Sequence, residues 1–181
     1  RMMVDVGSEK GSINESEKEM IQNVFEFDNK TAEEVMTHRT EAVILWLDET
    51  EEEWDKKISE SRHSRYPVCD GSADNVIGVL YIKDYYIIED KSRGNIMKNA
   101  VKTAYYVPET VRTDILFQNM KKSRNHFAVV FDEYGGMSGI ITMNDLLEQI
   151  VGDIDDDYLV PEEEEIEKID DEIDRLKKYS N

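Results

Sequence analysis

Cysteine and long apolar runs are the first things that this sequence of 181 residues has little of. Cys69 is the only cysteine, which excludes an internal disulfide and a cysteine metal cluster and fits a reducing, cytoplasmic setting best. The longest apolar runs, residues 42–47 and 127–131, fall far short of the roughly 20 residues that a membrane-spanning helix needs. No signal peptide is visible, so the chain as given is expected to be soluble.

Basic residues are scarce as well. The sequence has 22 lysines and arginines against 41 acidic residues, which gives a formal net charge of -19. Such a surface repels a phosphate backbone, so nucleic acid is not expected as a partner. Residues 153–172 hold twelve of the acidic residues and one lysine. Because much of the charge is local, the rest of the chain could still bind a small anion.

No set of residues typical of a catalytic site or a metal site stands out. Three histidines and one cysteine lie on unrelated predicted elements, so no catalytic residue is assigned. Gly135-Gly136 lacks the lysine that a phosphate-binding loop needs. Residues 153–157 have part of the spacing of a calcium loop, with Glu164 at the twelfth place, but Tyr158 stands where glycine is needed. Neither a structured metal site nor a redox cofactor is expected, although diffuse Mg²⁺ binding is possible.

A helix is expected near each end of the chain. Ser12 and Glu15 have the spacing of a capping box, and the apolar residues that follow predict an amphipathic helix over residues 13–26. Near the other end, four apolar residues form one stripe of a helix behind four consecutive glutamates: Ile166, Ile169, Ile173 and Leu176. This acidic helix either lies against another surface or frays.

The middle of the chain contains one pattern twice, at a separation of 61 residues. The matched pairs are residues 65–69 with 126–130, 77–80 with 138–141, Asp84 with Asp145, and Trp54 with Ile115. Each copy predicts a first strand, an acidic-led helix, a two-stranded hairpin and a closing helix. The first strands are expected at residues 42–47 and 103–107, and the helices carry Trp54 and Ile58 or Ile115, Leu116 and Met120.

A β-α-β-β-α unit of about 60 residues is too small to cover both faces of its sheet. We therefore expect an α+β protein in which the two repeats pack sheet to sheet with pseudo-two-fold symmetry, plus the N-terminal helix and the acidic C-terminal helical tail. The expected boundaries are a linker with its helix over residues 1–27, the repeats over 28–92 and 93–157, and the tail over 158–181.

Thr142 and Asp145 stand at the start of the last closing helix, in the stretch GIITMNDLL. In one interpretation they only begin the helix, with Thr142 as N-cap and Asp145 at the third helical position. In the other, the helix end attracts a phosphate, the hydroxyl adds a donor, and the carboxylate accepts from both hydroxyls of a ribose. One geometry serves both interpretations, and the residues alone leave them open.

Two matching sets of residues carry a resemblance to a known family. They are Pro67-Val68 with Gly78-Val79-Leu80 and Asp84, and Ala128-Val129 with Gly139-Ile140-Ile141 and Asp145. This pattern resembles a tandem pair of cystathionine-β-synthase (CBS) domains, the assembly called a Bateman module. Three longer stretches resemble the CorC/HlyC (TlyC, hemolysin-like) branch, which is related to the CNNM magnesium transporters: EEVMTHRTEAV (33–43), HFAVVFDEYGGMSGIITMNDLLEQIVGDIDDDY (126–158) and EIEKIDD (165–171).

For function, the resemblance implies a regulatory module that binds AMP, ADP or ATP, the last with Mg²⁺. It also implies a homodimer formed through the repeats, attached to the membrane domain of a magnesium or cobalt transport or efflux protein and lying at its cytoplasmic face. The chain would then be a soluble fragment of that protein. The alternative is a structural dimerisation module with a vestigial nucleotide pocket; neither implies an enzyme.

The resemblance also implies a set of site residues. Thr142 and Asp145 match the Ser/Thr-x-x-Asp signature for an adenosine nucleotide, in which the aspartate holds the ribose. Val35, Met36 and Ile140 would hold the adenine. Other residues expected near the ligand are Thr31, Glu34, Ser64, Asn125 and Asn144, and the candidates for phosphate charge are Arg39, Arg65, Lys122, Arg124 and His126.

The first repeat departs from this signature. It keeps Asp84 but has Tyr81 where the second repeat has Thr142. A bulky ring in place of a small hydroxyl predicts a second site that is weaker or empty. His38 stands where the branch commonly has proline, and the loss of proline's fixed backbone angle leaves the position of Arg39 less constrained.

Overall fold

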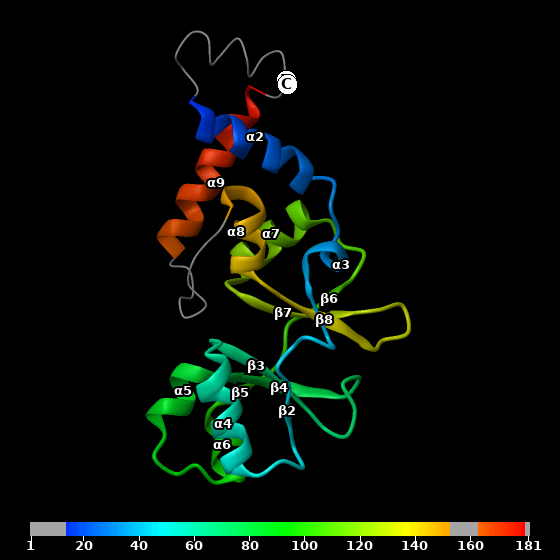
Figure 1. Cartoon of the computed structure of the whole chain (residues 1–181), viewed down its shortest axis with the longest axis vertical. Helices are drawn as coiled ribbons and strands as arrows, with labels where there is room; N and C mark the ends of the chain where they lie inside the picture. The colour runs from blue at the N-terminus through cyan, green and yellow to red at the C-terminus, as the bar shows by residue number, and fades with distance from the viewer. Residues whose placement is uncertain (1–13, 153–162, 180–181) are drawn as a thin grey trace.

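The computed structural model describes residues 14–152 and 163–179. Two repeats follow one another along the long axis of the molecule, and the helices α2 and α9 lie together at the end formed by the second repeat (Figure 1). Ser12 and the acidic run at residues 153–157 are outside the described residues. None of the helices in the described part of the chain has the length and apolar character that a membrane crossing requires.

Each repeat has the predicted β-α-β-β-α order, which confirms the α+β class. In the first repeat the elements are β2 (Leu45–Trp46), α4 (Glu51–Ser61), β3 (Arg65–Cys69), β4 (Val76–Tyr81) and α5 (Ile82–Ile87). In the second they are β6 (Tyr106–Pro108), α7 (Thr113–Ser123), β7 (Phe127–Phe131), β8 (Met137–Thr142) and α8 (Met143–Val151). The two first strands, predicted at residues 42–47 and 103–107, are shorter than expected, and β6 begins three residues late.

Short elements at the start of each repeat, ahead of its first β-α-β-β-α strand, connect it to the other repeat, and the sequence pattern did not predict them. They are α3 (Ala32–Val35) with β1 (Thr37–His38), and α6 (Arg93–Asn99) with β5 (Val101–Lys102). β1 pairs antiparallel with β8, and β5 pairs antiparallel with β4. The sheets therefore have the orders β1-β8-β7-β6 and β2-β3-β4-β5. The first segment of each repeat thus supplies an edge strand to the sheet of the other repeat.

The two sheets pack against each other, as expected. One buried cluster combines apolar side chains of the first repeat with those of the second: Ile44, Cys69 and Val79 with Ala104, Phe127, Val129 and Met137. Such a layer removes the inner faces of both small sheets from water. The exchanged edge strands and this shared layer give the molecule its pseudo-two-fold arrangement.

The separation of 61 residues is wrong for the first half of each repeat. α4 and α7 begin 62 residues apart, as do β3 and β7, whereas β4 and β8 begin 61 apart. Trp54 is fully buried but Ile115 is 45% exposed, and the buried counterpart of Trp54 is Leu116. The cause is the hairpin: six residues join β3 to β4 and five join β7 to β8.

The N-terminal helix α2 (Glu15–Phe27) is confirmed, but its predicted cap at Ser12 is wrong. The N-cap is Asn14, whose side chain accepts a hydrogen bond from the Glu17 N–H at 2.8 Å. Glu17 completes a capping box by reaching back to the backbone of Asn14. Asparagine caps a helix as well as serine does. The sequence therefore contains two overlapping capping-box patterns, Ser12 with Glu15 and Asn14 with Glu17, and the helix begins at the second.

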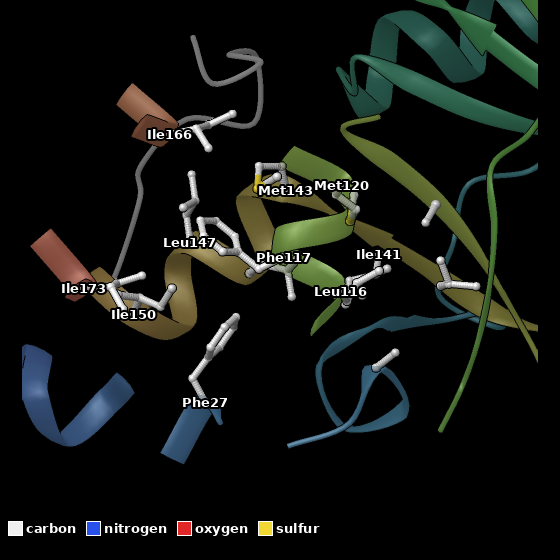
Figure 2. Packing of buried hydrophobic residues seen from close by; sticks show 14 of the residues in the cluster. Phe27, Leu116, Phe117, Met120, Ile141, Met143, Leu147, Ile150, Ile166 and Ile173 are labelled. Carbon is white, nitrogen blue, oxygen red and sulfur yellow. The ribbon is translucent and has the colours of Figure 1, made fainter. Parts of the chain in front are cut away.

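The C-terminal helix α9 (Glu163–Lys177) lies against the second repeat, which settles one of the two expectations for it. Its apolar stripe is buried in the same core as α2, α7 and α8, as Ile166, Ile173, Phe27, Phe117 and Leu147 show in Figure 2. Asp170, 8% exposed, lies on that face and accepts hydrogen bonds from Gln118 at 2.9 Å and from the Lys121 ammonium. The carboxylate is therefore paired, as a buried charge must be.

Replacement of Gly139 by alanine is expected to destabilise the fold. A Cβ atom there would lie 2.2 Å from the Thr37 carbonyl oxygen and 3.0 Å from the Met36 sulfur, so β1 would have to move away from β8. We expect urea unfolding followed by circular dichroism to show a loss of about 1–3 kcal/mol in the free energy of unfolding. Gly94→Ala is the control, because no atom lies within 4 Å of its added Cβ. Equal stability of the two variants would contradict the close approach.

Cys69 is expected to be unreactive in the folded protein. Burial raises the pKa of its thiol to about 11, and the nearby Asp74 carboxylate adds to the shift. At pH 8 the reactive thiolate is therefore scarce, and the side chain is fully buried. We expect Ellman's reagent to titrate one thiol in denaturant and none within minutes in the native protein. Rapid reaction of the native protein would show that the layer between the sheets opens readily.

Candidate functional site

A cleft of about 330 Å³ lies where the two repeats meet, at the N-terminal end of α8. Seven of the predicted site residues lie around it: Ser64, Arg65, His126, Ile140, Thr142, Asn144 and Asp145. They come from both repeats, because the chain reaches the cleft at the start of β3 and again at the starts of β7 and α8. A ligand held there would touch both halves of the molecule.

Thr142 and Asp145 begin α8 as a reciprocal capping box. The Asp145 N–H donates to the Thr142 hydroxyl at 3.1 Å, and the Thr142 N–H donates to the Asp145 carboxylate at 2.9 Å. The helix-start interpretation is thus confirmed. It does not exclude a ligand, because a carboxylate has acceptor sites enough for a helix cap and a ribose hydroxyl together. The cap also holds both side chains at the helix end that attracts phosphate.

The corrected separation of 62 residues identifies Ser64 and His126 as equivalent residues. The carbonyl of Ser64 accepts from the Ile82 N–H at the start of α5, and the carbonyl of His126 accepts from the Met143 N–H at the start of α8, both at 2.9 Å. Each residue therefore fixes the start of a closing helix to the neighbouring strand. This common role explains why both residues reach the cleft. Asn125, which a separation of 61 residues would match with Ser64, does not line it.

Arg65 and His126 bring basic groups to the cleft. The Arg65 Nε is buried and has no hydrogen-bond partner in the described part of the chain. The His126 side chain is 9% exposed, and its Nε2 lies 3.1 Å from the Glu163 carboxylate. Burial lowers the pKa of His126, and the positive charge of Arg65 lowers it further, while the contact with Glu163 opposes the shift. The ring is therefore neutral at pH 7.

The other predicted site residues lie elsewhere. Thr31 and Glu34 form the capping box of α3, while Val35 and Met36 pack against the core of the second repeat. Arg39 donates to Asp74 at 2.8 Å and to the Met137 carbonyl at 3.3 Å, at the hairpin ends of the two repeats. The remaining three do not line the cleft: Asn125 bonds to Ser123, Arg124 ends α7 and Lys122 lies within α7. His38 is exposed, and its ring bonds to Thr40.

Seven residues around the cleft were not expected from the sequence: Thr37, Glu41, Ala42, Val43, His63, Phe127 and Glu148. Thr37 begins β1, and Glu41, Ala42 and Val43 belong to the chain between β1 and β2. This chain reaches the cleft because β1 crosses to the second repeat. Glu148 lies one helical turn after Asn144, so the helical period of α8 could have indicated it. His63 and Phe127 are direct neighbours of predicted residues.

The matching position in the first repeat has an aromatic side chain, Tyr81, before the start of α5. The Tyr81 ring lies between two cations, with the Arg65 guanidinium 4.7 Å and the Lys102 ammonium 4.6 Å from its centre. Lys102 also pairs with Asp84 at 3.5 Å, and α5 has no side-chain cap at its start. The starts of the two closing helices thus differ in their side-chain contacts, at Tyr81 and Thr142.

The cleft is mixed in charge. Glu41, Asp145 and Glu148 face it together with Arg65, and His63 and His126 add two imidazoles. Across the described ranges, no three side chains of histidine, cysteine, aspartate or glutamate are grouped as a metal site would need. The arrangement suits an anion that also offers hydroxyl donors to a carboxylate.

Comparison with known proteins identifies the family. The profile of the CBS domain matches residues 32–86 and 95–152. Hemolysin C of Brachyspira hyodysenteriae is 37% identical over 160 residues, which are 88% of this chain and 59% of that protein. The chain spans only 37% of the length of other curated relatives, several of which are named UPF0053 proteins.

Two solved structures from the bacterial CNNM/CorC family of Mg²⁺ transporters have the same fold and are 32% identical to this chain. One is a CBS domain in complex with the inhibitor IGN95a, with a TM-score of 0.75 over 86% of this chain and 96% of that one. The other is a CBS domain in complex with ATP, with a TM-score of 0.67 over 76% of this chain and 99% of that one. The chain therefore belongs to the CBS-domain family, as a tandem CBS pair of the hemolysin C and CNNM/CorC branch.

Proposed function

We propose that the cleft binds an adenosine nucleotide (AMP, ADP or Mg-ATP) and that this CBS pair is the regulatory module of a larger magnesium or cobalt transport or efflux protein. The observation that carries the proposal is the meeting of Asp145 and the N-terminus of α8 with Arg65 of the other repeat in one cleft. A similar CBS domain, 32% identical, is described in complex with ATP. In the parent protein the module lies at the cytoplasmic face, attached to a membrane domain.

Each part of a nucleotide has a suitable partner in the cleft. The Asp145 carboxylate accepts from the ribose hydroxyls, since a charged acceptor makes the stronger hydrogen bond. The phosphate lies at the start of α8, where the Thr142 hydroxyl, the helix dipole and Arg65 favour negative charge. Ala42, Val43, Phe127 and Ile140 offer apolar contact for the adenine. Mg²⁺ reduces the repulsion between a triphosphate and Glu41 or Glu148.

Sensing requires that the nucleotide favours one arrangement of the repeats over another. The cleft meets this condition, because its walls come from both repeats and from the crossing chain ahead of β2. Differential affinity for two arrangements of these walls would be passed on to the attached domain. The competing function, a dimerisation module with a vestigial pocket, draws its support from Tyr81, which stands at the place of Thr142 in the first repeat.

Asp145→Asn is expected to weaken nucleotide binding about tenfold or more, because the ribose loses a charged acceptor. The amide oxygen can still accept from the Thr142 N–H, so the start of α8 is kept. Titration calorimetry with AMP, ADP and ATP, each with and without Mg²⁺, measures the change in Kd.

Asp84→Asn is the matched control, since it removes the same charge at the equivalent place of the first repeat. We expect less than a twofold change for this variant and a stoichiometry of one nucleotide per chain. Millimolar or weaker binding to the wild type would favour the dimerisation module. Equal affinities of the wild type and Asp145→Asn would remove Asp145 from the site.

We further propose that the CBS pair forms a homodimer through α5. Tyr86 and Ile87 on this helix are 63% and 77% exposed, whereas Leu147, the equivalent of Tyr86 on α8, is 2% exposed beneath α2 and α9. A second copy would give α5 the cover that α8 has within the chain.

Ile87→Asp is therefore expected to turn dimer into monomer in sedimentation velocity at micromolar concentrations, because a charge would be buried at the interface. Ile115→Asp is the control, since Ile115 is 45% exposed on α7 and lies apart from the proposed interface. A wild type that remains monomeric at about 100 μM, where a dimer with a micromolar Kd would be mostly assembled, would contradict the dimer.

A further inference from the structure

We propose that Glu163, at the start of α9, competes with the phosphate of the nucleotide for His126 and thereby makes the acidic C-terminal helix a sensor of phosphate in the cleft. This inference rests on the proposed function, because it takes a phosphorylated ligand at the start of α8 as given. It assigns a role to a contact that neither the helix cap nor the family signature explains.

The contact joins the cleft to α9 directly. His126 lines the cleft, and its carbonyl holds the first N–H of α8. Its Nε2 lies 3.1 Å from Glu163 Oε1. A carboxylate can only accept, so the ring must donate its Nε2–H to Glu163. Glu163 thus contacts a residue that both lines the cleft and fixes the start of α8.

One donor cannot serve two anions equally well. A neutral imidazole carries a single N–H, which the structure commits to Glu163. A phosphate oxygen that accepts from His126 must displace the Glu163 carboxylate. If the carboxylate stayed, it and the phosphate would repel each other beside the same ring. Adenosine has no phosphate and leaves the contact intact. Glu163 therefore lowers the affinity for phosphorylated ligands and has little effect on the nucleoside.

Loss of the contact between Glu163 and His126 would loosen only the first turn of α9. Three residues after Glu163, Ile166 is fully buried in the core of the second repeat. One turn further on, Glu167 and Asp170 hold Lys121 of α7. These contacts keep the body of α9 docked, so the turn that begins with Glu163 is the part that a phosphate in the cleft can release.

The test is titration calorimetry at constant ionic strength on the whole chain, with adenosine, AMP and ATP as ligands. We expect Glu163→Gln to bind AMP and ATP about fivefold more tightly than the wild type, because an amide competes less well than a carboxylate for His126. Adenosine should bind both proteins alike. Glu164→Gln is the matched control: it removes the same charge one residue away, where the side chain is exposed, and should change each Kd less than twofold.

Hydrogen exchange of the wild type gives an independent readout. AMP and ATP are expected to speed the exchange of the amides of residues 167–169, because their helical hydrogen bonds run to carbonyls in the first turn of α9. Adenosine should leave these amides unchanged. Nucleotide binding that depends on Asp145, with equal affinities for Glu163→Gln and Glu164→Gln and no change in α9, would overturn this inference and leave the proposed function standing. Absence of nucleotide binding to the wild type would overturn both.

Discussion

The pairing of β1 with β8 is the contact on which the rest of the molecule depends. It needs Gly139, because the Thr37 carbonyl passes so close to this residue that a side chain would not fit. By crossing to the second repeat, the chain ahead of β2 completes that sheet and carries Thr37, Glu41, Ala42 and Val43 to the cleft. β5 makes the mirrored crossing at Gly78, where an added Cβ would also meet backbone. Neither repeat can close its sheet alone, so the cleft exists only in the pair.

The helix start at Thr142 shows how one local geometry stabilises a helix and also suits the proposed ligand. The capping box satisfies backbone N–H groups that would otherwise lack partners, and it fixes the two side chains at the positive end of the helix. In the first repeat the same position has Tyr81, and there Asp84 pairs with Lys102 instead of capping its helix. The Arg65 and Lys102 cations lie over the Tyr81 ring, a contact that the Thr142 hydroxyl cannot make. The two closing helices therefore begin with different side-chain contacts.

Much of the fold could be predicted from the sequence because the patterns involved are local. Apolar periodicity gave the hairpins, the long helices and the repeat, and the spacing of Thr142 and Asp145 gave the start of α8. The prediction that Trp54 and Ile115 are equivalent was wrong. The hairpin loops differ by one residue, which changes the separation of the repeats but leaves the apolar pattern of each strand unchanged. The placement of Arg39 could not be predicted either, since its partner Asp74 lies 35 residues away in a loop of the first hairpin. Contacts of that kind follow from how the sheets exchange edge strands, which no local pattern encodes.

The exchange of edge strands also decides how far a signal from the cleft can travel. β1 and β5 join the sheets through only two residue pairs each, whereas the shared apolar layer between the sheets is buried and close-packed. A shift of one repeat against the other must therefore repack that layer, and packed layers of this kind change between discrete arrangements more readily than they deform gradually. Asp74 stands at the rim of the layer, where it holds Arg39 and the Met137 N–H, which lies 3.1 Å from its carboxylate. The Asp74 carboxylate thus contacts both the crossing chain, at Arg39, and the second hairpin, at Met137. This contact lies at the opposite end of β8 from Thr142. Any rearrangement that a ligand favours at the start of α8 has to be compatible with the contacts of Asp74. β8 connects the two places, so a change at either end can shift this strand.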